Sequence, residues 1–110
     1  MTATLTKYFS FSASYSKGQK VTGHNYVLGV TTGELHEHEE TFLERGVREA
    51  LIQKVHSRDF GDHVEFLKGT DFSDHALLKA FWPVIQEAVK PIRLEALSLE
   101  RDGKTKAELQ

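Results

Sequence analysis

The chain has 110 residues, of which 39% are apolar and 27% are charged, and its formal net charge is −2. This length predicts one domain, residues 1–110, with a single modest core, and the near-neutral charge disfavours nucleic-acid binding through phosphate neutralisation. The chain contains no cysteine and no run near the roughly 18 apolar residues of a membrane span, which excludes disulfides and membrane-spanning helices and leads us to expect a cytoplasmic protein.

The N-terminal part predicts two strands. Residues 3–14 alternate between a largely apolar set and a set of serine, threonine and tyrosine, which is the period of a strand with one buried face. A second strand is expected over about residues 23–33, with Tyr26, Leu28 and Val30 on one side. Because only the short stretch 16–20 connects them, the two strands are expected to pair in antiparallel fashion.

The middle of the chain predicts two helices. Apolar residues recur at helical spacing over about residues 40–57, and three glutamates lie where negative charge suits the N-terminus of this helix. Ser73 has the character of an N-cap for a second amphipathic helix that extends to about Lys90. Pro83 lies inside that helix and predicts a kink or a break near residues 79–82.

The C-terminal part predicts a hairpin. Residues 93–100 have the pattern of a strand, Asp102 and Gly103 form a strong turn signal, and residues 105–109 make a short returning strand. The order ββααββ predicts an α+β fold in which a four-stranded antiparallel sheet carries two helices on one face. Such a sheet leaves its edges unpaired, so we expect self-assembly into a barrel-like ring.

Two of the six histidines, His36 and His38, lie among the glutamates that precede the first helix. Histidines two residues apart share one face of an extended chain, and with those carboxylates they are candidate ligands for a cation. The pattern is not HExxH, and an exposed polar turn before a helix explains it at least as well.

Two aspartate–histidine pairs are candidates for acid–base chemistry. Asp62 and His63 lie between the helices, where an aspartate that orients an imidazole yields a general acid or base near neutral pH. A histidine that bridges or caps the loop is the competing interpretation. Asp74 and His75 repeat the dipeptide at the start of a helix, where capping explains the aspartate without chemistry.

Two further residues are candidates for binding. Glu100 ends the third strand, and its carboxylate is able to accept two hydrogen bonds from an amino-heterocycle. The competing interpretation is an exposed charge paired with Arg101 or Lys104. His24 follows Gly23 at the mouth of the second strand, which is a common setting for a metal ligand or a catalytic residue.

Four motifs carry a resemblance to a known family. They are FSAS at residues 11–14, GHNY at 23–26, GDH at 61–63 and LSLE at 97–100. In this order and spacing the chain resembles, over almost its whole length, the 6-pyruvoyl-tetrahydropterin synthase family, which includes the 6-carboxytetrahydropterin synthases of queuosine biosynthesis. The resemblance implies the tunnelling fold, a ββααββ unit that assembles into a β-barrel oligomer, either a tetramer or a hexamer of two trimers.

The resemblance also implies a pterin pocket between subunits. Glu100 falls where the family's glutamate anchors the pterin, Asp62 and His63 fall on its catalytic pair, and His24 falls on the second histidine of its HGH zinc motif. The chain departs from the family at the other zinc ligands, because Tyr15 and Thr22 stand at the two remaining histidine positions. It also lacks the family's cysteine base.

Three hypotheses follow. The first is a divergent homologue that binds a pterin or a related heterocycle without a cofactor and has altered or lost the zinc-dependent elimination from dihydroneopterin triphosphate, with His63 as proton carrier in any metal-free step. The second is a true carbon–oxygen lyase in which His24 holds zinc together with residues such as His36 or His38. The third is a non-catalytic oligomeric protein that retains only the fold.

Overall fold

The computed structural model describes residues 3–17, 20–69 and 71–110, and the side chains of Lys17, Asp62 and His63 lie outside the described part. Two long strands come first, β1 (Thr4–Lys17) and β2 (Lys20–Gly33). The central segments are α1 (Glu37–Val47), a π-helical stretch (Arg48–Ile52), α2 (Gln53–Val55), β3 (Arg58–Asp59), α3 (Phe60–His63) and a 3-10 turn (Glu65–Leu67). The chain then forms α4 (Asp74–Val89), β4 (Leu94–Arg101) and β5 (Thr105–Leu109).

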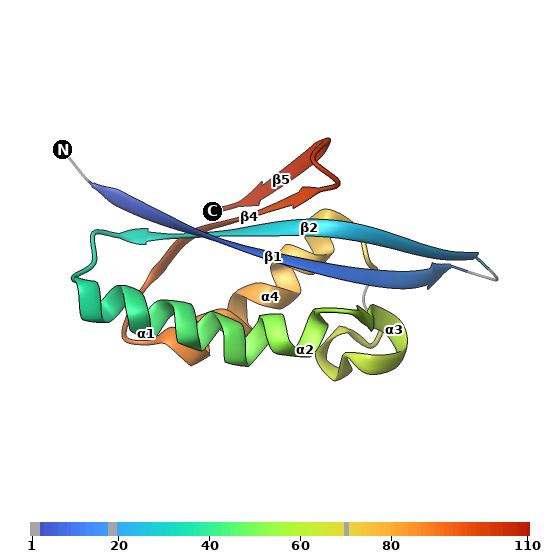
Figure 1. Cartoon of the computed structure of the whole chain (residues 1–110), viewed down its shortest axis with the longest axis horizontal. Coiled ribbons are helices and arrows are strands. Elements are labelled where there is room, and N and C mark those ends of the chain that lie inside the picture. The colour runs from blue at the N-terminus through green and yellow to red at the C-terminus, as the bar shows by residue number, and fades with distance from the viewer. Residues whose placement is uncertain (1–2, 18–19, 70) are drawn as a thin grey trace.

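The β1–β2 pair confirms the predicted antiparallel arrangement. Its register runs from Thr4 opposite Gly33 to Lys17 opposite Lys20, so both strands are longer than predicted. The predicted boundaries fell short because the apolar alternation ends near Ala13, beyond which the hairpin extends past the core. Figure 1 shows β1 and β2 as a long twisted ribbon that runs the length of the molecule.

The β4–β5 hairpin also forms at the predicted turn. Asp102 and Gly103 both have positive φ, 54° and 68°, which is the signature of the type I′ turn favoured between antiparallel strands. The turn is closed by the Lys104 N–H, which donates to the Arg101 carbonyl at 3.0 Å.

The sheet differs from the prediction in its number of strands. In the described part of the chain it has five strands in the order β3-β1-β2-β4-β5, and β3 runs parallel to β1. The prediction of a four-stranded, purely antiparallel sheet was therefore wrong. A strand of two residues is too short to show a period in the sequence, and β3 forms because the chain after α2 lies against the outer edge of β1.

Both predicted helices are present. The first begins at Glu37 and continues through the π-helical stretch to Val55, and the second begins after Ser73, whose Oγ accepts the Ala76 N–H at 3.4 Å. The second helix continues through Pro83 from Asp74 to Val89, so the expected break does not occur in this described segment. Proline removes one donor from the helix, and the neighbouring hydrogen bonds and packing preserve the rest.

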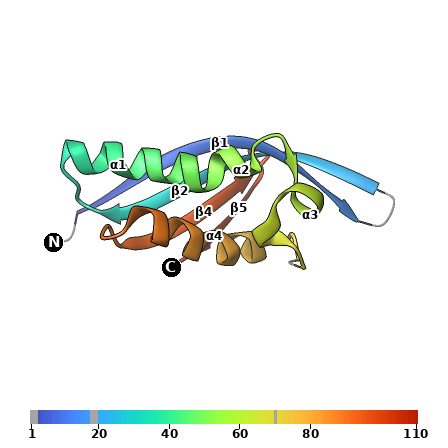
Figure 2. The ribbon, with the colours of Figure 1, turned by 90° about the horizontal axis from the view of Figure 1, so that it is seen from below.

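The helices cover one face of the sheet and leave the other open. Figure 2 shows α1, α2 and α4 together on the same side of the strands. Buried residues alternate along the strands and recur along the helices to form one core, whose largest fully buried members are Tyr26, Phe60, Phe81, Leu28 and Leu43. The even-numbered residues of β1 face the open side of the sheet. No helix within the described residues is long and apolar enough to span a membrane.

Candidate functional site

A pocket of about 410 Å³ lies on the open face of the sheet. It crosses β1, β2 and β4, because Ser12 is opposite Asn25 and Val27 is opposite Glu100 in the strand registers. The pocket therefore contains Glu100, the residue predicted to bind a heterocycle. Its lining consists of Ser10, Phe11, Ser12, Asn25, Tyr26, Val27, His56, Glu100, Asp102 and Gly103.

The carboxylate of Glu100 is available to a ligand. Glu100 is exposed, and among the described residues no basic side chain forms a salt bridge with it. Arg101 turns to the helix side of the sheet instead, where its Nε lies 3.3 Å from the Asp74 carboxylate. The competing interpretation, in which Arg101 or Lys104 neutralises Glu100, is therefore not what the structure contains.

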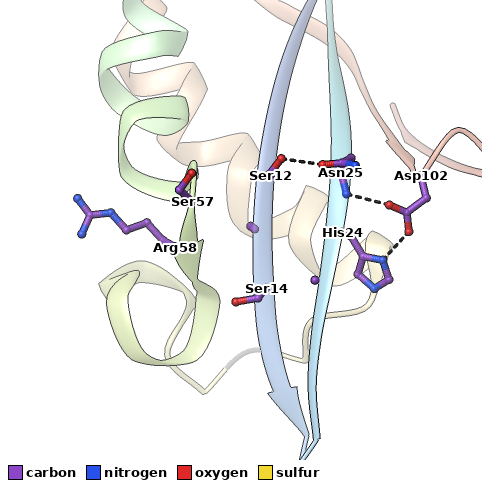
Figure 3. Close-up of a pocket in the computed structure, with 9 residues that line it drawn as sticks. Ser12, Ser14, His24, Asn25, Ser57, Arg58 and Asp102 are labelled. Atoms are coloured by element: carbon purple, nitrogen blue, oxygen red, sulfur yellow. Dashed lines mark hydrogen bonds and ion pairs between the residues drawn. The ribbon is translucent and has the colours of Figure 1, made fainter.

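A second pocket of about 360 Å³ shares Ser12, Asn25 and Asp102 with the first. Figure 3 shows the chain of hydrogen bonds that joins these residues across three elements. The Ser12 hydroxyl donates to Asn25 Oδ1 at 2.7 Å, and the Asn25 N–H donates to Asp102 Oδ1 at 2.8 Å. The other carboxylate oxygen of Asp102 lies 2.6 Å from His24 Nδ1. The β4–β5 turn is thus tied to β2, next to Glu100.

Asp102 is held in its ionised form by these contacts. The Asn25 backbone N–H and the His24 imidazole lower the pKa of the Asp102 carboxyl below its ordinary value, in that order of importance. Because an ionised carboxylate only accepts hydrogen bonds, Nδ1 of His24 must carry the proton. The same pairing with a carboxylate orients metal-binding histidines, and it leaves Nε2 free of that contact.

The free atom of His24 lies among aromatic rings. Nε2 is buried and has no hydrogen-bond partner among the described residues, and the imidazole contacts Tyr15 and Tyr26 with ring centroids 5.7 and 5.9 Å apart. Phe60 and Phe72 complete a closed circuit of ring contacts with these residues. Burial, and then the charge of Asp74, raise the pKa of the Tyr26 phenol, so this phenol stays neutral.

These surroundings do not fit a zinc ion. Tyr15 is opposite Thr22 in the hairpin register and its ring contacts His24, so the structure does bring the three positions of the expected zinc motif together. Their donors, however, are one imidazole, one phenol and one alcohol, whereas a catalytic zinc site uses three His, Cys or carboxylate ligands. No group of three or more such side chains able to hold a metal occurs among the described residues.

His36 and His38 do not supply the missing ligands within one chain. Gly33 lies nine positions after His24 along the extended strand β2, a span of roughly 30 Å, and both histidines lie beyond that end. Their rings stack on each other at 5.9 Å. His36 is the N-cap of α1, and its backbone N–H donates to the Glu39 carboxylate at 3.0 Å, so the polar turn before a helix accounts for this segment.

Asp62 and His63 close α3, but their side chains lie outside the described part of the structure. Their catalytic pairing therefore stays a prediction. For the other aspartate–histidine pair, Ser73 rather than Asp74 provides the side-chain cap of α4, and Asp74 pairs with Arg101.

His56 is a pocket residue that sequence reasoning missed. It follows α2 directly and lines the same pocket as Glu100. Its Nδ1 accepts the Ser12 backbone N–H at 3.1 Å, a contact between residues 44 positions apart. No motif marks His56 in the sequence, because its role depends on where the end of α2 meets β1.

A long twisted hairpin, a sheet covered by helices on one face and a polar pocket on the open face match the tunnelling fold. The particular protein that this chain resembles in structure is the 6-pyruvoyl tetrahydropterin synthase of Caenorhabditis elegans, which matches with a TM-score of 0.83 over 100% of this chain and 96% of that chain. The two sequences are 18% identical, so the likeness establishes the fold. No protein-family model matches the sequence, and no curated protein matches it.

The Asp102 contacts make stability depend on pH. A carboxyl whose pKa is lower in the folded chain stabilises it fully above the unfolded pKa of about 3.9, and this contribution is lost as pH falls towards the folded pKa. We expect Asp102→Asn, which suits the positive φ, to be less stable than the wild type at pH 7, with the difference shrinking below about pH 4. Urea unfolding across this range tests it, with Glu95→Gln as control. A difference that does not change with pH would contradict the assignment.

Proposed function

We propose that this chain is a 6-pyruvoyl-tetrahydropterin-synthase-like protein that binds a pterin or a related amino-heterocycle, and that the zinc-dependent elimination of that family is lost in it. One observation carries the proposal: the unpaired carboxylate of Glu100 lines a pocket that also offers Ser12, Asn25 and His56. The motifs around residues 11–14, 23–26 and 97–100 also favour a protein of this kind. The likeness in fold supports the same proposal.

The chemistry of the pocket suits such a ligand. A carboxylate binds an exocyclic amine and a neighbouring ring N–H through two parallel hydrogen bonds, which are strong because the acceptor is charged. Val27, which is partly exposed on the open face, gives the same pocket apolar carbon against which a flat ring is able to pack. A volume of about 410 Å³ lies within the roughly 300–1,000 Å³ that is common for small-molecule sites.

The lost elimination follows from the donor set around His24. The family's reaction needs a Lewis acid on the substrate hydroxyls and a cysteine base, and here Tyr15 and Thr22 replace two ligands while cysteine is absent. Any remaining reaction on the bound ring, of the carbon–oxygen lyase class or another, would proceed by metal-free proton transfer. His63 is the proton carrier proposed from the sequence.

We further propose that the subunit works as a homo-oligomer, either a tetramer or a hexamer of two trimers. Within the described chain β5 is an edge strand, and β1 pairs with β3 only at Ala13 and Ser14, so most of its outer edge has no strand partner. Unpaired edges favour association with further strands, and a second copy supplies them in a symmetric ring.

The role of Glu100 is tested by titrating neopterin into the wild type and into Glu100→Gln. The amide removes the charge and one acceptor, so binding is expected to weaken roughly ten- to hundredfold. Stability should hardly change, because Glu100 is exposed and carries no salt bridge in the described structure. Glu95→Gln, on the same strand outside the pocket, is the matched control. Wild type that gives neither heat nor a thermal shift at millimolar neopterin would sink the proposal.

The metal content of the protein tests the proposed loss of the zinc-dependent elimination. Protein purified without chelator is expected to contain far less than one zinc ion per chain, and His24→Ala should leave that content unchanged. Elemental analysis by mass spectrometry measures both. One zinc per chain in the wild type that disappears in His24→Ala would show that His24 is a working ligand and would contradict the proposed loss.

A further inference from the structure

The imidazole of His56 is fixed in one protonation state by the backbone of β1. The Ser12 N–H donates to Nδ1 of His56 at 3.1 Å. A backbone amide is only a donor, so Nδ1 must present a lone pair. The ring is therefore neutral and carries its proton on Nε2, because an imidazolium has no lone pair on either nitrogen.

The surrounding backbone holds this arrangement. His56 leaves α2 in an extended conformation, and Ser57 has a φ of 59°, which a residue other than glycine rarely adopts. The Ser57 N–H donates to the Ser12 carbonyl, and β3 continues from Arg58 in parallel register with β1. Both backbone groups of Ser12 are thus engaged by two consecutive residues, and the imidazole takes the place of a strand hydrogen bond.

A strained backbone at this point is consistent with a functional role. Among the described residues only Ser57 and Asp102 combine a side chain with a positive φ, and both border the pockets. Residues held in such conformations cost free energy that the rest of the fold must offset, and they cluster at binding and catalytic sites.

We propose that His56 is a fixed, neutral hydrogen-bond donor on the wall of the Glu100 pocket, and that it selects ligands which present a ring acceptor in addition to the donor edge bound by Glu100. This inference rests on the proposed function for the identity of the ligand. Glu100 and Asp102 supply acceptors to the pocket, and Nε2–H of His56 supplies the complementary donor. The ligand class is a planar amino-heterocycle that carries a ring carbonyl or an unprotonated ring nitrogen.

The protonation state is tested without any ligand. Nitrogen-15 spectra of the histidine rings at pH 7.5 distinguish the Nε2–H tautomer, the Nδ1–H tautomer and the cation, and His56→Asn identifies the relevant signal. We expect the Nε2–H pattern for His56. An Nδ1–H pattern or a cation at this pH would overturn the inference.

Selectivity is tested with neopterin and its 2,4-diamino analogue, in which an amino donor replaces the ring carbonyl. His56→Asn keeps an oxygen near the Nδ1 position for the Ser12 N–H but removes the distal donor. The control is His75→Asn, at an exposed position of α4. The analogue also lacks the ring N–H that binds Glu100, so some preference for neopterin does not depend on His56. We expect the wild type and the control to prefer neopterin by a factor roughly five- to tenfold larger than His56→Asn does.

The same preference in the wild type and in His56→Asn would overturn the selective role. If the wild type binds neither pteridine while His56 shows the Nε2–H pattern, the proposed function and the ligand class fail, and the tautomer assignment stands. Urea unfolding of His56→Asn separates a loss of binding from a loss of fold.

Discussion

Ser12 makes the hydrogen bonds on which the arrangement of the site depends. Its N–H and carbonyl engage His56 and Ser57 at the outer edge of β1, and its hydroxyl donates to Asn25 on the other side. Asn25 in turn holds Asp102 in the β4–β5 turn. Ser12 therefore links the end of α2 to β1 and β2, and through Asn25 it is also connected to the β4–β5 turn. Glu100 lies two residues before Asp102 and is opposite Val27 in the β2–β4 register.

The contrast between the two faces of the sheet explains why a site forms there at all. The helices bury the apolar residues of β1, β2 and β4, so the alternate residues of the same strands remain on the open face. Serines and Asn25 on that face present short polar groups at regular spacing, and Glu100 adds a charge with no partner in the described chain. The apolar side provides stability and leaves the polar side free for recognition.

The region around His24 combines an oriented imidazole with an aromatic cluster. Asp102 orients the imidazole as a carboxylate orients a metal ligand, yet Tyr15, Tyr26, Phe60 and Phe72 surround it with rings. An aromatic cluster stabilises the end of the hairpin by burial and ring contacts. In this account the bond between His24 and Asp102 fastens the turn beside Glu100.

Local patterns predicted much of this fold. Period-two alternation predicted β1 and β2, helical spacing and Ser73 predicted the two long helices, and the Asp102–Gly103 dipeptide predicted the type I′ turn. The binding role of Glu100 stays a prediction. β3 was not predicted because a strand of two residues is too short to show an alternating pattern. The role of His56 and the contact between His24 and Asp102 were also not predicted. The first depends on a hydrogen bond between residues 44 positions apart and the second on one between residues 78 positions apart, and no local sequence pattern indicates such contacts.

The central claim is that the open-face pocket at Glu100 is where a heterocycle binds. Backbone amide spectra recorded during a titration with neopterin test it most directly, because they locate the ligand without assuming an activity. The account predicts that the shifted amides cluster at Ser12, Asn25, His56 and Glu100. Shifts that cluster instead in the separate groove formed by Gln53, Lys54, Val64 and Phe66, or no shifts at millimolar ligand, would contradict it.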